Sequence, residues 1–287
     1  MSRQAVTSNG VPIPFTPELF APLADSTPLA GDLPALRRRF RQDGVVLLRG
    51  FLDRRKVLDL RGAYLSRFPD GLFAAGSTPE EGIFSGRAPD GLPAHGVRGH
   101  PAHAFVRERL FASFADQPAL RRLAEALLGG PVDRLPRAIL RHFHAGTLMA
   151  SRAHTDHAYM TRGSERVLTM WIPVGDCPME AGGLVYLEGS HREAAERFER
   201  ARLGSDRAGD PRPISHDLRA TAQAVGRRWL WHDYEAGDLT VHSPHLVHAS
   251  LDTVTDAMRV SVDLRFILRG EKADTRWMKE WAGDDGA

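Results

Sequence analysis

The chain has 287 residues, of which 42% are hydrophobic, and its 38 basic and 36 acidic residues leave a formal charge of only +2. The length and the hydrophobic fraction argue against a fibrous or disordered chain, and the near-balance of charge argues against nucleic acid as a partner. One cysteine excludes an internal disulfide, and no apolar run approaches the roughly 18 residues of a membrane-spanning helix.

The N-terminal part is predicted to be an extended arm followed by helices. Five prolines between positions 12 and 28 forbid a long helix in residues 1–31, which we expect to form the arm. Helical periodicity runs from Leu33 to Gly44, and the apolar run 45–48 predicts a short buried strand. A second helix is predicted to begin after Asp53, which is a good N-cap residue. Residues 32–134 are therefore expected to be mainly helical support.

Another helix is predicted to begin at Asp116-Gln-Pro118 and to end at Gly129. Two Gly/Pro-rich stretches are predicted to be irregular, namely Pro69 to His103 and Gly204 to Pro213. Long irregular stretches in a compact protein are usually functional or disordered. We hypothesise that both are mobile lids that close over the site when substrate binds. The alternative is that both are permanently disordered surface loops.

After residue 135 the apolar period changes from 3.6 to 2, which indicates strands. The candidates are Arg137–Phe143, Val167–Val174, Gly183–Leu187, Trp229–His232, Asp238–His242, Leu246–Ser250 and Arg259–Leu268. Short strands without long helices between them predict a jelly roll. We expect a single, mainly β domain with flanking helices. Its jelly-roll core spans 135–270, with an insertion at 192–224 that is helical over 193–203, and residues 271–287 form a tail.

The central motif is His154-Thr-Asp156. In an extended strand residues i and i+2 point to one side, so both side chains can reach one metal ion. One more histidine completes the 2-His-1-carboxylate set typical of non-haem Fe(II). The histidines available for this role are His242, His245 and His248. The pair alone is weak evidence, because such short motifs also occur by chance.

The strand predicted at 259–268 carries a polar face. Alternation places Arg259, Ser261, Asp263 and Arg265 on one side and apolar residues on the other. Such a face lines a ligand cavity or belongs to a solvated edge strand. In a cavity, Arg259 can bind a carboxylate through its fork of donors, with the Ser261 hydroxyl beside it.

The chain resembles the phytanoyl-CoA dioxygenase family of Fe(II)- and 2-oxoglutarate-dependent oxygenases. The likeness rests on the His-x-Asp pair, the segment 180–191 (EAGGLVYLEGSH), the Gly237-Asp238 strand that leads to His248-Ala-Ser, and Arg259 eleven residues after His248. It implies a double-stranded β-helix (cupin-like jelly roll). It also implies that His154, Asp156 and His248 bind iron and are catalytic, and that Arg259 anchors 2-oxoglutarate.

The resemblance extends to neighbouring positions. It implies that Ser261 assists Arg259, and that Thr169 and Trp171 line the co-substrate pocket, although these two could equally be ordinary barrel filling. Family members often carry a lysine before the pair, and this chain offers Arg141, His142 and His144 instead. Whether Arg141 or His142 contacts the co-substrate stays open. His191 is expected to be a structural hydrogen-bond donor.

The expected activity is that of a 2-oxoglutarate-dependent non-haem iron dioxygenase. Iron, 2-oxoglutarate and O2 are the expected cofactor and co-substrates, and the reaction is hydroxylation of an unactivated C–H bond of a small molecule in bacterial metabolism, with release of succinate and CO2. Desaturation or cyclisation would use the same iron. The alternative is a non-oxidative metal-binding jelly-roll protein, either an isomerase or a binding module. We expect a cytoplasmic monomer or homodimer with no membrane partner.

Overall fold

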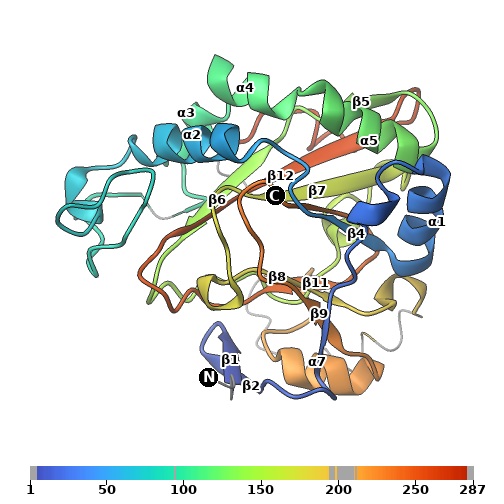
Figure 1. The fold of residues 1–287 in the computed structure, drawn as a ribbon, viewed down its shortest axis with the longest axis horizontal. Helices are drawn as coiled ribbons and strands as arrows, with labels where there is room; N and C mark the ends of the chain where they lie inside the picture. The colour runs from blue at the N-terminus through green and yellow to red at the C-terminus, as the bar shows by residue number, and fades with distance from the viewer. Residues whose placement is uncertain (1–4, 94, 194–197, 199–209, 211, 283–287) are drawn as a thin grey trace.

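The computed structural model describes residues 5–93, 95–193, 198, 210 and 212–282. Its centre is a pair of β-sheets (Figure 1). Residues of both sheets line a cavity. The larger sheet has the order β4-β10-β7-β12-β5, with β6 also paired to β12. The bounds of its strands are β4 Val45–Leu48, β5 Val132–Arg134, β6 Ile139–Phe143, β7 Val167–Pro173, β10 Leu239–His242 and β12 Arg259–Leu268.

The smaller sheet has the order β11-β8-β9-β3. Its strands are β11 His248–Ser250, β8 Leu184–Leu187, β9 Trp229–Trp231 and β3 Phe20–Pro22. The β3–β9 pairing is parallel, and the β11–β8 and β8–β9 pairings are antiparallel. Two sheets of this kind form the predicted jelly roll.

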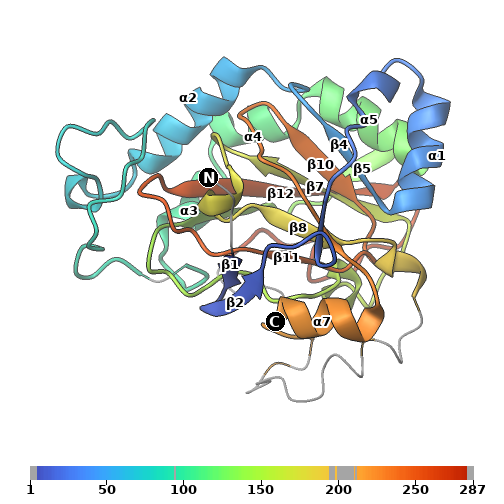
Figure 2. The same cartoon turned by 60° about the horizontal axis from the view of Figure 1, so that its bottom comes forward.

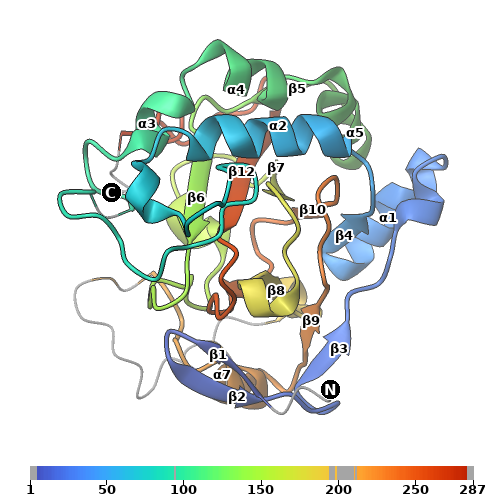
Figure 3. The same ribbon diagram turned by 60° about the vertical axis from the view of Figure 1, so that its left-hand side comes forward.

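Helices cover the outer side of the larger sheet (Figures 1 and 3). They are α1 Leu33–Asp43, α2 Arg54–Leu65, α3 Pro101–Phe105, α4 Arg109–Ala115 and α5 Pro118–Leu128. At the opposite end lie α7 Leu218–Val225 and the hairpin of β1 Ala5–Ser8 and β2 Val11–Pro14 (Figure 2). In the part of the chain that the structure describes, no helix has the length and apolar character needed to cross a bilayer.

Local sequence signals explain the first helices. The Asp32 carboxylate accepts a hydrogen bond from the Ala35 amide at the start of α1, and the Asp53 carboxylate accepts one from the Lys56 amide at the start of α2. Helix α1 ends at Gly44, which adopts a φ of 74° that other residues reach only with strain. The predictions for these two helices and for β4 are confirmed.

Strand β12 is the centre of the larger sheet. It pairs with β7 along one edge and with β6 and β5 along the other. Its apolar side chains, Val260, Val262, Leu264 and Phe266, are buried in the same core as helix α5. The alternative of a solvated edge strand is therefore wrong, because both edges of β12 are paired and its polar face lines the cavity.

Several expectations need correction. The extended arm contains the β1–β2 hairpin and contributes β3 to the smaller sheet. Helices α3 and α4 and strand β5 had no clear sequence signal, and the predicted insertion contains α7 near its end. Helix α5 begins within the predicted segment Asp116-Gln-Pro118, with Gln117 as its N-cap residue. The tail holds two buried tryptophans, Trp277 and Trp281. Most of the helix predicted at 193–203 and of the stretch 204–213 lies outside the described residues.

Candidate active site

A backbone bridge between distant segments brings two histidines together. The His154 amide donates to the His248 carbonyl at 3.0 Å, and the His248 amide donates back at 2.9 Å. Directly opposed residues of an antiparallel pair project their side chains to the same side. The two imidazole rings accordingly lie with centroids 4.2 Å apart.

Both imidazoles are held in one tautomer. The Nδ1 atom of His154 lies 2.6 Å from the Arg152 carbonyl oxygen, and Nδ1 of His248 lies 3.0 Å from that of Leu246. Because a carbonyl oxygen can only accept, each Nδ1 must carry the proton, and each Nε2 keeps a free lone pair. Burial lowers the pKa of both histidines, which favours the neutral, ligating form.

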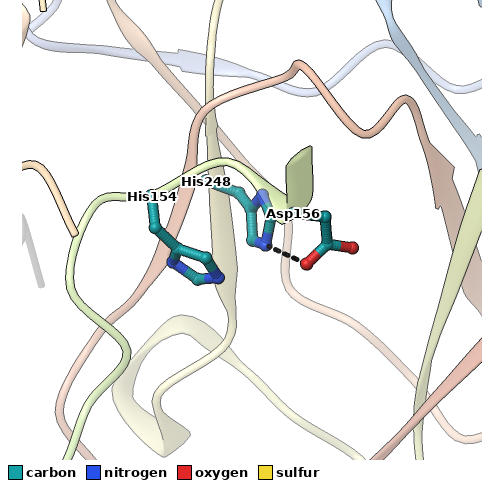
Figure 4. Close-up of side chains that lie close together, drawn as sticks. All are labelled: His154, Asp156 and His248. Carbon is teal, nitrogen blue, oxygen red and sulfur yellow. Dashed lines mark ion pairs between the residues drawn. The ribbon is translucent and has the colours of Figure 1, made fainter. Parts of the chain in front are cut away.

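Asp156 opens a short 3-10 helix, η3 (Asp156–Tyr159), so the predicted continuous strand through the His-x-Asp pair is wrong. Thr155 is the N-cap of this turn, and its hydroxyl accepts a hydrogen bond from the Ala158 amide. The pair still converges, because the turn follows directly after the bridge at His154. The ligand atoms of His154, Asp156 and His248 all lie within 4.8 Å of one another (Figure 4).

A row of side chains across the larger sheet supports Asp156. His242 of β10, Thr169 of β7 and Arg265 of β12 are register partners. The Thr169 hydroxyl donates to one carboxylate oxygen, and Arg265 donates to the other at 3.1 Å. Nε2 of His242 lies 3.4 Å from the carboxylate. This row fixes the carboxylate orientation.

The charge of Asp156 is strongly stabilised. Its side chain is 3% exposed, and burial alone would raise its pKa. The opposing effects of Arg265, His242 and His248 outweigh burial and hold the pKa of Asp156 well below its ordinary value. The carboxylate is therefore ionised, as a metal ligand must be.

The three candidates for the third ligand have different positions. His248 belongs to the group with His154 and Asp156. His242 lies beside this group, on the opposite oxygen of Asp156, with its ring 4.5 Å from that of His248. His245 points away and meets Glu165 at 3.2 Å in a separate, partly exposed cluster with His157. His191 lies against Gly44, away from the cavity.

A cavity of about 450 Å³ opens beside the three ligand atoms. All four residues of the polar face of β12 line it. Arg259 is 3% exposed, lies 4.8 Å from the Phe143 ring centroid and 5.5 Å from that of Trp171. Its Nε has no hydrogen-bond partner among the described residues. Burial lowers the pKa of Arg259, and Cys177 and Asp263 offset part of this effect. A buried guanidinium in this state favours an anionic ligand.

Of the remaining predicted residues, four line the cavity and one points away from it. Ser261, Thr169 and Trp171 line the cavity, although Thr169 is engaged by Asp156. On β6, alternation directs Arg141 into the cavity, where it binds Asp263 at 2.5 Å. His142 points to the helices and contacts the Tyr64 hydroxyl at 2.8 Å. His142 is thus removed as a co-substrate contact.

The described part of the stretch 69–103 does not line the cavity. Phe84 stacks on His144 with centroids 3.9 Å apart, and its amide donates to the Asp256 carbonyl at 2.7 Å. Leu72 and Phe73 are buried in the larger core. The second half is anchored too, because Nε2 of His95 lies 3.1 Å from the Leu140 carbonyl oxygen and Ala102 is buried in the larger core. The proposed movement of this stretch stays a prediction.

Sequence reasoning missed two of the three residues that support the carboxylate, namely Arg265 and His242. Arg265 was placed on the polar face, and His242 was considered only as a ligand, but their contacts with Asp156 depend on strand register. The available signal was the spacing of Arg265 from Arg259, six residues along one strand face.

Comparison with known proteins places this site in a family context. The family model described as phytanoyl-CoA dioxygenase (PhyH) matches residues 40–261. A 1-deoxypentalenic acid 11-beta-hydroxylase of Streptomyces exfoliatus is 26% identical over 271 residues, covering 88% of this chain and 89% of that protein. The enzyme of the same name from Streptomyces arenae is 25% identical and covers 91% of each chain.

Solved structures show the same architecture. The epimerase SnoN of nogalamycin biosynthesis, in complex with Fe3+, alpha ketoglutarate and nogalamycin RO, is 23% identical with a TM-score of 0.57, covering 84% of this chain and 85% of that one. The carbocyclase SnoK of the same biosynthesis is 21% identical with a TM-score of 0.58, covering 88% of both chains. At this identity the similarity shows the fold, and it confirms the predicted jelly roll.

Proposed function

The chain belongs to the phytanoyl-CoA dioxygenase family, and from this premise we propose that it is an Fe(II)- and 2-oxoglutarate-dependent dioxygenase that hydroxylates an unactivated C–H bond of a small molecule. The net reaction converts 2-oxoglutarate and O2 to succinate and CO2 while one oxygen atom enters the C–H bond. The names of the two Streptomyces relatives, both hydroxylases, support hydroxylation. Desaturation and cyclisation would need the same site.

The observation that carries the proposal is the donor set around Asp156. Two neutral imidazoles with free Nε2 atoms and one ionised carboxylate lie on one side of an open cavity. This set fits Fe(II), which takes two histidines and one carboxylate and leaves positions for other ligands. We assign His154, Asp156 and His248 as the iron ligands.

We assign Arg259 to the distal carboxylate of 2-oxoglutarate. Its guanidinium is buried in the cavity wall, its Nε lacks a hydrogen-bond partner among the described residues, and the Ser261 hydroxyl lies on the same strand face. Arg265 is less suited to this role because it is occupied by Asp156. A bidentate arginine–carboxylate contact fixes both the position and the orientation of its ligand.

The bound iron supplies the activation of O2 that oxidation of an unactivated C–H bond requires. The protein's own residues do the remaining work. The carbonyls of Arg152 and Leu246 orient the imidazoles, and the row of His242, Thr169 and Arg265 holds the carboxylate. Such supporting contacts tune metal affinity by about 10- to 100-fold. The rings of Phe143 and Trp171 lie against the Arg259 guanidinium and help to fix its position.

Anaerobic titration tests this function. The protein is loaded with Fe(II) and titrated with 2-oxoglutarate, and the expected result is a weak visible charge-transfer band that saturates at one equivalent. Succinate is the negative control. It lacks the 2-oxo group that chelates iron and should therefore give no band. Binding of 2-oxoglutarate without a band, or no binding, would favour the rival of a non-oxidative jelly-roll protein.

A further inference from the structure

The lining of the cavity carries an excess of positive charge. Among the described residues five arginines and three aspartates line it: Arg141, Arg152, Arg212, Arg259, Arg265, Asp156, Asp210 and Asp263. With neutral histidines the lining therefore has two more positive than negative charges. The proposed contents do not change this excess, because the two charges of Fe(II) and the two of 2-oxoglutarate cancel.

The aspartates are already distributed among three of the arginines. Arg265 binds Asp156 at 3.1 Å, and Arg141 binds Asp263 at 2.5 Å. Arg212 binds Asp210 at 2.8 Å. With Arg259 assigned to the co-substrate, the remaining cation of the lining is Arg152.

Arg152 is held in place by the backbone on both sides. The Ser151 amide donates to the Ser250 hydroxyl at 2.6 Å, and the Ala153 amide donates to the Ser215 carbonyl at 2.9 Å. The Arg152 carbonyl accepts the Nδ1 proton of His154. The backbone of Arg152 is therefore held in place two residues from the proposed iron ligand His154.

The Arg152 side chain is partly buried and makes no hydrogen bond or ion pair with any described residue. Its charge acts on Asp210, which is itself bound by Arg212, and Arg212 stacks 4.4 Å from the Tyr159 ring centroid. Arg152 and Arg212 therefore form a second basic group on the cavity wall, in addition to Arg259. Asp210 neutralises one charge of this group and leaves the other.

The apolar part of the lining limits the rest of the ligand. Ile139, Met149, Leu184 and Trp277 contribute to the same wall. Met149 is 47% exposed, and the adjacent Leu148 is 64% exposed. Exposed apolar side chains beside a cavity are typical of a surface that binds an apolar molecule.

We propose that the substrate is a small carboxylic acid with an apolar body, and that Arg152 binds its carboxylate. This proposal rests on the proposed function and adds the substrate class and the residue that recognises it. The anion offsets the excess charge, while the apolar body lies against the apolar side chains of the same cavity lining. A neutral or cationic substrate would leave the Arg152 charge without a partner.

Calorimetry with matched probes tests the proposal. The anaerobic protein, loaded with Fe(II) and 2-oxoglutarate, is titrated with cyclohexanecarboxylic acid and adamantane-1-carboxylic acid, and then with the corresponding carboxamides. The acids should bind at least about tenfold more tightly than the amides, since a hydrogen bond to a charged group contributes more than one to a neutral group. In Arg152→Gln the affinity for the acids should fall by about 10- to 100-fold, which removes most or all of their preference over the amides. Arg152→Lys should restore part of it.

Arg228→Gln is the matched control, because Arg228 is 45% exposed and lies outside the cavity lining. It should leave acid and amide affinities unchanged. The charge-transfer band distinguishes a failure of the proposed function from a failure of the carboxylate proposal. If the band is absent, the proposed function itself is contradicted. A normal band in a protein that binds acid and amide equally, or binds neither, contradicts the carboxylate proposal. An acid preference that survives in Arg152→Gln contradicts the role of Arg152.

Discussion

Replacing Arg259 by methionine should separate co-substrate binding from folding and from metal binding. Methionine keeps most of the length and the apolar stem but removes the charge. Truncating one partner of a buried, hydrogen-bonded charge pair costs about 2–5 kcal/mol. Since about 1.4 kcal/mol corresponds to a tenfold change, we expect the dissociation constant of 2-oxoglutarate to rise by about two orders of magnitude. Calorimetric titration of the anaerobic Fe(II) protein measures this change.

The same variant makes a second, opposite prediction for the protein without 2-oxoglutarate. In that state the Arg259 guanidinium is buried with its Nε unsatisfied among the described residues. Removing it relieves a desolvated charge, so the melting temperature should not fall. Iron affinity should also be unchanged, because Arg259 is absent from the row that contacts Asp156. Loss of iron with retained 2-oxoglutarate affinity would refute the reasoning and make Arg265 the candidate for the co-substrate.

Three further variants or measurements follow from the same geometry. Asp156→Ala should abolish iron binding and succinate release, because it removes the one anionic ligand of the proposed set. Undiminished succinate release would contradict the assignment of Asp156 as an iron ligand. Arg265→Met should weaken iron binding by about 10- to 100-fold through loss of a supporting contact, measured by competition with a chelator, and an unchanged affinity would make Arg265 structural. Hydrogen exchange of residues 69–103 should slow when substrate binds; equal exchange in both states would remove the lid hypothesis for this stretch.

The sequence predicted the strands of the core well because their alternation is local. Strand β12 has the predicted bounds. Its polar face lines the cavity, which was one of the two alternatives predicted for this face. Helix α1 begins at the predicted Leu33, and helix α2 begins after the predicted N-cap Asp53. These features depend on neighbours a few residues apart, which a single sequence records directly.

Contacts that depend on register could not be predicted from the same sequence. The row of His242, Thr169 and Arg265 under Asp156 exists because β10, β7 and β12 pair with one particular offset. A shift by one residue would turn each side chain to the other face. The convergence of His154 and Asp156 also arises differently from the prediction, through a bridge followed by a 3-10 turn.

The short elements have a similar explanation. Strand β5 and helices α3 and α4 have three, five and seven residues, which is too few for a periodic pattern to stand out. The burial of Trp277 and Trp281 depends on where the tail meets the helical layer, beside the side chains of Arg265 and His103. Neither contact has a local signal.

An anaerobic crystal structure with Fe(II) and 2-oxoglutarate tests the central claim most directly. The account predicts an anomalous iron peak bounded by Nε2 of His154, the carboxylate of Asp156 and Nε2 of His248, with the distal carboxylate of 2-oxoglutarate on Arg259. Iron bound through His242 in place of His248 would contradict the assigned ligand set. Iron bound only at the partly exposed cluster of His157, Glu165 and His245 would contradict the proposed function.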